Sequence, residues 1–294
     1  MNTNFVLSHR KEEPERSVLY LVGTPIGNLD DISLRAINIL KKVSLIACED
    51  TRKTGKLLKH YKFSNKLISF HQHNSLKRLD FLIKKLKNEE SIALVSDAGM
   101  PLISDPGELL VKKARDNHFE VITIPGPCAA IAGLVCSGLN SSRFSFYGFI
   151  PKTNTERNIL LGEISSSKKT SIVYESPKRI IRLLSDLKKF CGGSRNIALL
   201  REITKKFEQH YVNTIDMVIN EIETIEPKGE FTLIISGNPN VTDQTKFADR
   251  GLRNELLELI DAGLSHSRAS NYLSKKSGRS RNEIYKLIIE NEIN

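Results

Sequence analysis

The sequence lacks the features of a membrane or secreted protein. No apolar run approaches the roughly 20 residues that a transmembrane helix requires, and the opening MNTNFVLSHRKEEPERS has no apolar core of a secretory signal. Cysteine is scarce, and its spacing shows no C-x-x-C pair, which argues against a disulfide framework or a cysteine zinc site; the cysteines are Cys48, Cys128, Cys136 and Cys191. We therefore expect a cytoplasmic protein without a membrane segment, in which residues 1–16 form a mobile charged tail.

The sequence also lacks the glycine-rich fingerprints of phosphate binding. Residues 23–28 read GTPIGN, which matches neither G-x-G-x-x-G nor G-x-x-x-x-G-K-[ST]. Residues 96–107, SDAGMPLISDPG, place carboxylates where a phosphate group would need donors. His71 and His73 form an H-x-H pair, but no third ligand cluster accompanies them, so we expect no metal site. An enzyme that binds nucleotide phosphates is accordingly disfavoured.

Positive charge is present in excess. Lys and Arg outnumber Asp and Glu by 44 to 34, which gives a net charge of +10. Such a balance favours an extended polyanion, above all nucleic acid, as a partner, although it also serves solubility. Near the C-terminus, residues 265–286 carry basic side chains that either contact phosphates or form a solvated face; they are Arg268, Lys275, Lys276, Arg279, Arg281 and Lys286.

Short β-rich runs alternate with amphipathic helical patterns between residues 17 and 237. This alternation predicts largely parallel sheets with helices on both faces, which is an α/β fold. The predicted strands cover residues 17–22, 45–48, 66–70, 91–96 and 121–125 in the first half, and residues 170–176, 196–202 and 231–237 in the second half.

A joint between two domains is predicted where Pro125 and Pro127 bracket Gly126. We expect an N-terminal α/β domain at residues 17–125 and a second α/β domain at residues 126–240. From Asp249 the pattern becomes purely helical, and a capping box at residues 280–283 begins its last helix. Residues 249–294 are therefore predicted to form a small helical extension.

Several predicted strands end in loops rich in glycine and proline. Open α/β sheets bind ligands at the carboxyl ends of their strands, and glycine allows the backbone to approach a ligand closely. The acidic loop at residues 96–107 suits a neutral or cationic ligand with hydroxyl groups and an apolar part. S-adenosylmethionine has these features, because it combines a sulfonium, a ribose and a flat adenine.

The same loops carry a resemblance to a known family. In chain order they read GTPIGNLDDIS, CEDTRKTGKLL, FHQHN, SDAGMPLISDPG, IPGPCAAIAGL, YESPKRI, REITKKFE and KGEFTLIISG. Together they resemble the tetrapyrrole methylase superfamily, from about residue 18 to residue 237. Within it, the chain is most similar to members that 2′-O-methylate a cytidine ribose in the decoding region of 16S rRNA.

The resemblance implies two α/β domains of the tetrapyrrole methylase type, with S-adenosylmethionine bound between them in a non-Rossmann manner. It also implies a homodimer, and a substrate of 16S rRNA within a small ribosomal subunit or its precursor. The positions that it assigns to the cofactor are Pro25, Ile26, Gly27, Asp97, Ala98, Gly99, Met100, Ile103, Ser104, Ala129, Ala130, Tyr174, Glu230, Phe231 and Thr232.

Some of these positions have a simpler interpretation. Asp97, and Asp105 in the same loop, are also residues that cap turns and the helix that follows. The small side chains of Ala129 and Ala130 also suit the ordinary close packing of a helix. A ligand role and a structural role therefore both stay open at these positions.

Candidate catalytic residues follow the second predicted strand, in the segment CEDTR. A ribose hydroxyl needs somewhere for its proton to go, and a carboxylate or a hydrogen-bonding partner near its oxygen would help. Glu49, Asp50 and Arg52 are placed to face the cleft. Alternatively, Asp50 and Arg52 form an ion pair that orders the loop. The basic side chains that we expect near a phosphate of the substrate are Lys53, Arg179, Arg201, Lys205 and Lys206.

Two rival functions stay open. One is methylation of tetrapyrrole carbon atoms on the same scaffold, since a fold does not dictate its substrate. The other is RNA binding without catalysis. The segments CEDTR and YESPKR, the basic excess and the helical extension favour methylation of RNA.

Overall fold

The chain divides into two compact units. The computed structural model describes residues 13–223, 227–239, 244–277 and 284, and its units are residues 1–237 and residues 238–294. Apart from residues 238–240, both predicted α/β domains fall within the first unit, and their predicted limits stay predictions. Most of the expected N-terminal tail and the capping box at residues 280–283 lie outside the described residues.

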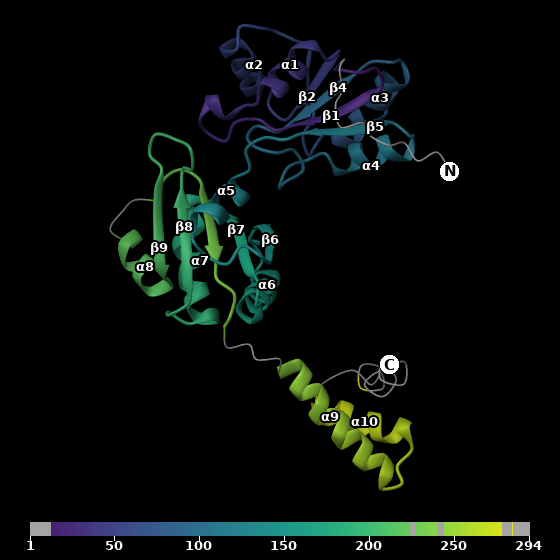
Figure 1. Cartoon of the computed structure of the whole chain (residues 1–294), viewed down its shortest axis with the longest axis vertical. Coiled ribbons are helices and arrows are strands. Elements are labelled where there is room, and N and C mark those ends of the chain that lie inside the picture. Colours follow the sequence, from purple (N-terminus) through teal and green to yellow (C-terminus); the bar gives the residue numbers. More distant parts are fainter. Residues whose placement is uncertain (1–12, 224–226, 240–243, 278–283, 285–294) are drawn as a thin grey trace. The chain divides into compact units, whose positions relative to one another are not determined.

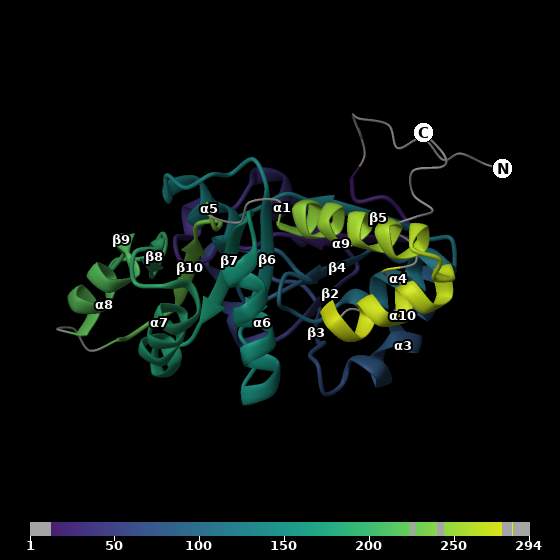
Figure 2. The same cartoon turned by 90° about the horizontal axis from the view of Figure 1, so that it is seen from below.

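The first sheet of the first unit is entirely parallel (Figures 1 and 2). Its strand order is β3-β2-β4-β1-β5. The alternating pattern of strands and helices predicted this arrangement. The strands are β1 (Val18–Val22), β2 (Leu45–Cys48), β3 (Leu67–Ser69), β4 (Ile92–Val95) and β5 (Glu120–Ile124).

Helices cover both faces of this sheet, because its strands are apolar on both sides. Tyr20 and Ile46 pack on one face with α1 (Leu34–Lys42) and α2 (Thr51–His60). Leu19 and Leu94 pack on the other face with α3 (Ser75–Lys87) and α4 (Glu108–Asp116). A short 3₁₀ helix, η1 (Leu29–Asp31), leads from the loop after β1 toward α1.

The second sheet is mixed, with the order β6-β7-β10-β8-β9. Only β6 and β7 pair in parallel, whereas β10 runs antiparallel to β7 and β8, and β9 runs antiparallel to β8. The prediction of a largely parallel sheet was therefore wrong for this half of the chain. The strands are β6 (Phe144–Phe149), β7 (Thr170–Glu175), β8 (Asn196–Arg201), β9 (Gln209–Thr214) and β10 (Phe231–Ile235).

The strands that the sequence did not predict are the two at the edges of this sheet. β9 reads QHYVNT, which contains no apolar run, and most of its residues are exposed. It pairs directly with β8, with Leu199 opposite Tyr211, and this pairing introduces an antiparallel edge. β6 contains Gly148 at φ +64° and a register shift between Phe146 and Gly148, which interrupts its alternation.

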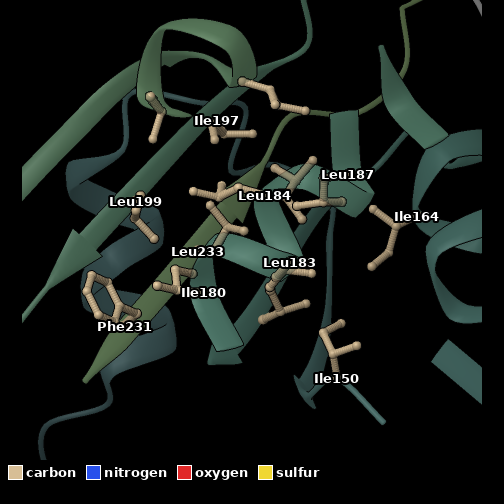
Figure 3. Packing of buried hydrophobic residues seen from close by; sticks show 14 of the residues in the cluster. Ile150, Ile164, Ile180, Leu183, Leu184, Leu187, Ile197, Leu199, Phe231 and Leu233 are labelled. Carbon is tan, nitrogen blue, oxygen red and sulfur yellow. The ribbon is translucent and has the colours of Figure 1, made fainter. Parts of the chain in front are cut away.

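The second sheet also lies between helices. One face packs against α6 (Asn154–Ser166), α7 (Pro177–Cys191) and α8 (Ile215–Glu223). Figure 3 shows Leu183, Leu184 and Leu187 of α7 facing Leu199 and Leu233 of the sheet. The other face packs against α5 (Ala129–Cys136), which carries small residues.

Helices α9 (Gln244–Asp261) and α10 (His266–Ser277) form the described part of the second unit and pack together (Figures 1 and 2). Their core consists of Leu256, Ala269, Leu273 and Ile284. Gly263, at φ +96°, follows the end of α9, as a glycine in the left-handed region commonly does. No helix in the described ranges combines the length and the hydropathy needed to cross a membrane.

Candidate active site

A cavity of about 380 Å³ is lined by the loop after β4 together with residues of β7 and β10. We call it the first cavity. Its volume lies in the range of small-molecule sites. The loop after β1 contributes Ile26, and the segment before α5 contributes Cys128. Residues from both halves of the first unit therefore form its wall.

Direct backbone contacts hold the loops of this wall together. The N–H of Thr24 donates to the carbonyl of Gly99 over 2.9 Å, and the N–H of Gly99 donates to the carbonyl of Thr24 over 3.1 Å. Gly99 has φ +82°, a conformation that favours glycine. At the predicted joint, a Cβ on Gly126 would lie 2.8 Å from Cα of Gly23. The glycines in these loops therefore permit two backbones to touch.

The loop at residues 96–107 keeps two non-glycine residues in the left-handed region. Leu102 has φ 72° and Ser104 has φ 65°. Such conformations cost free energy and cluster at functional sites. Between them, Ile103 is 39% exposed and lines the first cavity.

Tyr174, on β7, joins the sheet to the start of α5. Its hydroxyl accepts a hydrogen bond of 3.0 Å from the N–H of Ala130. Burial raises the pKa of the Tyr174 hydroxyl far above its ordinary value, so the group stays protonated at neutral pH. Phe149 lies edge-on to Tyr174, with ring centroids 5.7 Å apart, and is 54% exposed at the wall of the first cavity.

Asp97 connects the loops after β2 and β4. Its Oδ1 accepts a hydrogen bond of 3.0 Å from the N–H of Asp50, and its Oδ2 lies 2.8 Å from Nζ of Lys53. Asp97 also lines the first cavity. Asp97 therefore holds the neighbouring loop in place, and its role toward a ligand stays a prediction.

Asp50 caps α2 rather than lining the first cavity. Its Oδ1 accepts from the N–H of Arg52, and both of its oxygens accept from the Arg52 guanidinium, at 3.0 and 2.7 Å. These hydrogen bonds from Arg52 hold the pKa of the Asp50 carboxyl well below its ordinary value. The ion pair considered as an alternative is therefore present, and the Arg52 side chain is 86% exposed.

Glu49 lines a second cavity, of about 480 Å³, with Phe70, Gln72 and Ser75. Burial, and next the charge of Asp97, raises the pKa of the Glu49 carboxyl. Ser104 and Asp105 line both this second cavity and the first cavity. The two cavities are therefore neighbours that share part of a wall.

In this shared wall, the carboxyl of Asp105 has a strongly raised pKa. Burial, followed by the charges of Glu49 and Asp97, raises the pKa of its carboxyl to about 6. A hydrogen bond with the side chain of Ser96 partly opposes this rise. The sequence left both a ligand role and a capping role open for this aspartate, but its place in both cavities and its raised pKa were not predicted.

Two further carboxylates of the first cavity have cationic partners. Glu175 lies 2.6 Å from the Arg179 guanidinium, and Glu230 lies 3.1 Å from Nζ of Lys205. The side chain of Glu175 is fully buried, yet its Oε2 has no hydrogen-bond partner in the described structure. An unpaired buried acceptor in the wall of a cavity is one that a ligand can satisfy.

A third cavity, of about 340 Å³, lies beside the loop after β1 and is lined by Pro25 and Gly27. The lysines Lys53, Lys56 and Lys205 also line it. Ile26, Asp97 and Ala98 line both the first and the third cavity. Residues that the sequence assigned to the cofactor therefore lie in a wall that the first and third cavities share.

Most of the residues predicted to bind the cofactor are brought together in the first cavity. These are Ile26, Asp97, Ala98, Gly99, Met100, Ile103, Ser104, Ala129, Tyr174, Glu230, Phe231 and Thr232. Pro25 and Gly27 line the third cavity instead, and Ala130 is buried at 3% exposure beside the Tyr174 hydroxyl. Their roles toward a ligand stay predictions.

Sequence reasoning missed several wall residues, among them Phe149, Glu175 and Ile203. From the segment YESPKR, Tyr174 was assigned to the cofactor and Arg179 to phosphate contact, but Glu175 was given no role. Of the basic residues predicted to contact phosphate, Arg179 is engaged by Glu175, and Arg201 donates to Gln209 and to the carbonyl of Lys228. The described residues contain no group of three His, Cys, Asp or Glu side chains suited to a metal.

Comparison with known proteins agrees with this architecture. Residues 18–218 match the model of the tetrapyrrole (corrin/porphyrin) methylases. Two relatives are named ribosomal RNA small subunit methyltransferase I. The one from Synechocystis sp. is 44% identical over 94% of this chain and 98% of its own length. The one from Vibrio cholerae is 42% identical over 93% and 95%.

A solved structure shares the fold. The uroporphyrin-III-C-methyltransferase from Thermus thermophilus superposes with a TM-score of 0.54 at 16% identity, covering 75% of this chain and 94% of that chain. At this level of identity the likeness concerns the fold alone. Taken with the family model and the two relatives, the chain belongs to the tetrapyrrole methylase family and, within it, to the ribosomal RNA small subunit methyltransferase I group.

Proposed function

We propose that this protein transfers a methyl group from S-adenosylmethionine to the 2′-hydroxyl of a cytidine ribose in the decoding region of 16S rRNA. As a member of its family, the chain is an S-adenosylmethionine-dependent methyltransferase. The proposal of an RNA substrate rests on the similarity, over 94% of the chain, to a relative named for ribosomal RNA of the small subunit. The cavities alone would also suit another small acceptor.

The residues of the first cavity fit the cofactor. A cavity of about 380 Å³ with apolar walls at Ile26, Met100 and Phe231 can enclose an adenine and a ribose. Several carboxylates line it, and these suit a ligand that carries positive charge on sulfur and nitrogen. The unpaired Oε2 of Glu175 is available as a further acceptor for an N–H or O–H group.

The protein's own residues supply alignment and electrostatics. When bound, S-adenosylmethionine supplies a methyl group on a positively charged sulfur. The loop at residues 96–107 and Tyr174 would hold it, and Phe149 offers an exposed ring at the same wall. Holding the reacting groups in contact lowers the barrier by roughly 7–11 kcal/mol. A proton acceptor or a hydrogen-bonding partner for the hydroxyl is the remaining requirement. Glu49, Asp50 and Arg52 are the residues that the sequence predicts for this chemistry.

The nature of the substrate suggests the setting of the reaction. We propose that the protein acts in the cytoplasm, as a homodimer, on a small ribosomal subunit or its precursor. The net charge of +10 supports attraction to RNA phosphates. Lys53, Lys56 and Lys205 at the third cavity are suitable groups for phosphate contact. In the second unit, Arg268 and Lys275 belong to the predicted phosphate-contacting set.

The proposal is tested by incubating the purified protein with tritiated S-adenosylmethionine and small ribosomal subunits from a strain without this activity. We expect label in 16S rRNA and, on mapping, a 2′-O-methyl group on one cytidine of the decoding region. Uroporphyrinogen serves as the second substrate. Label in uroporphyrinogen alone would favour the tetrapyrrole reaction, whereas no binding of S-adenosylmethionine by calorimetry would favour a non-catalytic RNA-binding protein.

A further inference from the structure

The first cavity contains four carboxylates from the described part of the chain, and three of them have a cation close by. Asp97 pairs with Lys53 at 2.8 Å, Glu175 with Arg179 at 2.6 Å, and Glu230 with Lys205 at 3.1 Å; the fourth carboxylate is that of Asp105. No cationic side chain of the described residues lies within ion-pair distance of Asp105. A carboxylate neutralised by a lysine or an arginine is a weak proton acceptor, because the cation stabilises its ionised form.

The position of Asp105 distinguishes it from the carboxylates that the sequence favoured. Asp105 lines the first cavity and also the second cavity. Glu49 lines the second cavity only, and Asp50 lines neither and is held by Arg52. A group that accepts a proton during methyl transfer must reach the acceptor oxygen beside the methyl donor. Of Glu49, Asp50 and Asp105, Asp105 is the one that lines both cavities.

The second cavity has the dimensions and chemistry to receive part of a nucleotide. Its volume is about 480 Å³, and Gln72 and Ser75 provide hydrogen-bonding groups in its wall. Glu108 adds an acceptor, which is the group that pairs with the exocyclic amine of cytosine. A ribose entering from this side reaches the shared wall of Ser104 and Asp105 before it reaches the first cavity.

We propose that Asp105 is the catalytic residue that takes the proton from the 2′-hydroxyl of the target ribose, which approaches it from the second cavity. The inference rests on the proposed function. As the O–H bond breaks and its proton passes to the Asp105 carboxylate, the oxygen forms a bond to the methyl carbon, and the carbon–sulfur bond breaks with its electron pair left on sulfur. The proton then leaves Asp105 for solvent.

The acidity of Asp105 suits this task. Burial, with the charges of Glu49 and Asp97, places the pKa of its carboxyl at about 6, so the group is ionised at neutral pH yet more basic than an ordinary aspartate. The charges of Glu49 and Asp97 act on its carboxyl, and the hydroxyl of Tyr174 is coupled to it. The other titratable or charged groups that line the two cavities are Glu108, Cys128, Glu175, Lys205 and Glu230, and His71 acts on Glu49. The measured value will therefore be that of a coupled group.

The first test is the pH dependence of the native protein. Single-turnover methyl transfer to small ribosomal subunits is measured at saturating S-adenosylmethionine between about pH 5 and pH 9. We expect the logarithm of the rate to rise with a slope near one up to about pH 6 and then to level off. A rate that is independent of pH across this range would overturn the proposal, whatever any variant does.

The second test replaces the carboxylate by its amide. Asp105→Asn should lower the single-turnover rate by about 100- to 10,000-fold, while calorimetry shows an S-adenosylmethionine affinity within about threefold of the native value. Asp105→Glu should recover part of the rate. The matched control is Asp116→Asn, at the exposed end of α4, which should leave both quantities unchanged.

Other outcomes decide against the proposal. Asp105→Asn with a native single-turnover rate would exclude Asp105 as the proton acceptor. A rate that recovers fully when the S-adenosylmethionine concentration is raised would make Asp105 a binding residue instead. Should the amide variant fail to fold, the native pH profile and Asp105→Glu decide the question. A native protein that methylates no RNA ribose would refute the proposed function itself, and this inference with it.

Discussion

The backbone N–H of Ala130 donates a hydrogen bond of 3.0 Å to the hydroxyl of Tyr174. Ala130 lies in the first turn of α5, where backbone N–H groups have no partner within the helix. The side chain of Tyr174 therefore satisfies a helix terminus and forms part of the first cavity at the same time. A single phenol hydroxyl couples the stability of α5 to the shape of the site.

We predict that Tyr174→Phe destabilises the protein and weakens the binding of S-adenosylmethionine. The change leaves the N–H of Ala130 without its partner, which costs about 1 kcal/mol. Urea unfolding measures the stability, and calorimetry measures the affinity. The control is Tyr147→Phe, since the Tyr147 hydroxyl bonds Glu163 and does not line the first cavity. Equal affinities of the two variants would contradict a role for the Tyr174 hydroxyl in shaping the site.

Asp97→Asn is expected to raise the dissociation constant for S-adenosylmethionine by about tenfold or more, because a charge-assisted contact is worth roughly 1.5–3 kcal/mol. The amide loses the attraction to Lys53 that holds the loops after β2 and β4 together. Asp80→Asn is the control, since Asp80 also pairs with a lysine, Lys113, away from the cavities. Calorimetry that finds native affinity in a folded Asp97 variant would remove this residue from the binding site.

Asp50 allows its capping role to be separated from a catalytic role. Asparagine also caps helices, so Asp50→Asn should keep the stability of the protein, whereas Asp50→Ala should cost about 0.5–2 kcal/mol. The structure favours capping, because Arg52 holds both carboxylate oxygens. We expect Asp50→Asn to retain the native single-turnover rate within about threefold. A loss of about 100-fold with intact cofactor binding would instead make Asp50 the proton acceptor.

Leu184 tests the core that supports the second sheet. It is fully buried on α7 among the apolar residues of Figure 3. Leu184→Ala should lower the free energy of unfolding by about 2–5 kcal/mol, since the vacated space is only partly refilled. Ile159→Ala, at a position on α6 that is 68% exposed, should change it by less than about 0.5 kcal/mol. Equal effects in urea unfolding would contradict the packing described here.

The sequence predicted what depends on local pattern. The buried runs of β1, β2 and β4 are short and apolar on both faces, as central parallel strands are. The glycine- and proline-rich loop at residues 96–107 was assigned to a ligand, and it does line the first cavity. Both features follow from residues that are close in the sequence.

The features that the sequence did not reveal depend on residues that meet only in the folded chain. The polar strand β9 forms because it pairs with β8, and its sequence has no apolar pattern that would predict a strand. Likewise, the pKa of the Asp105 carboxyl is raised by burial and by the charge of Glu49, which follows another strand. The two cavities that share Ser104 and Asp105 could not be derived from the spacing of residues along the chain.

Asp105 should also give the protein a stability that depends on pH. Burial raises the pKa of its carboxyl from 3.8 in the unfolded chain to about 6 in the folded chain. The contribution of this group to the free energy of unfolding is therefore fully present below the unfolded pKa and is lost as the pH rises through about 6. Asp105→Asn removes this loss. Relative to the native protein, the variant should therefore gain more stability at about pH 7.5 than at about pH 4.5.

Urea unfolding of the native protein, Asp105→Asn and Asp116→Asn at these two pH values measures the effect. Asp116 is exposed, so its variant should show no comparable change between them. A gain for Asp105→Asn at the higher pH, together with a loss of methyl transfer, would mean that the ionised carboxylate is kept for the reaction at the expense of stability. A variant whose stability relative to the native protein is the same at both pH values would show that Asp105 titrates as an ordinary exposed carboxylate.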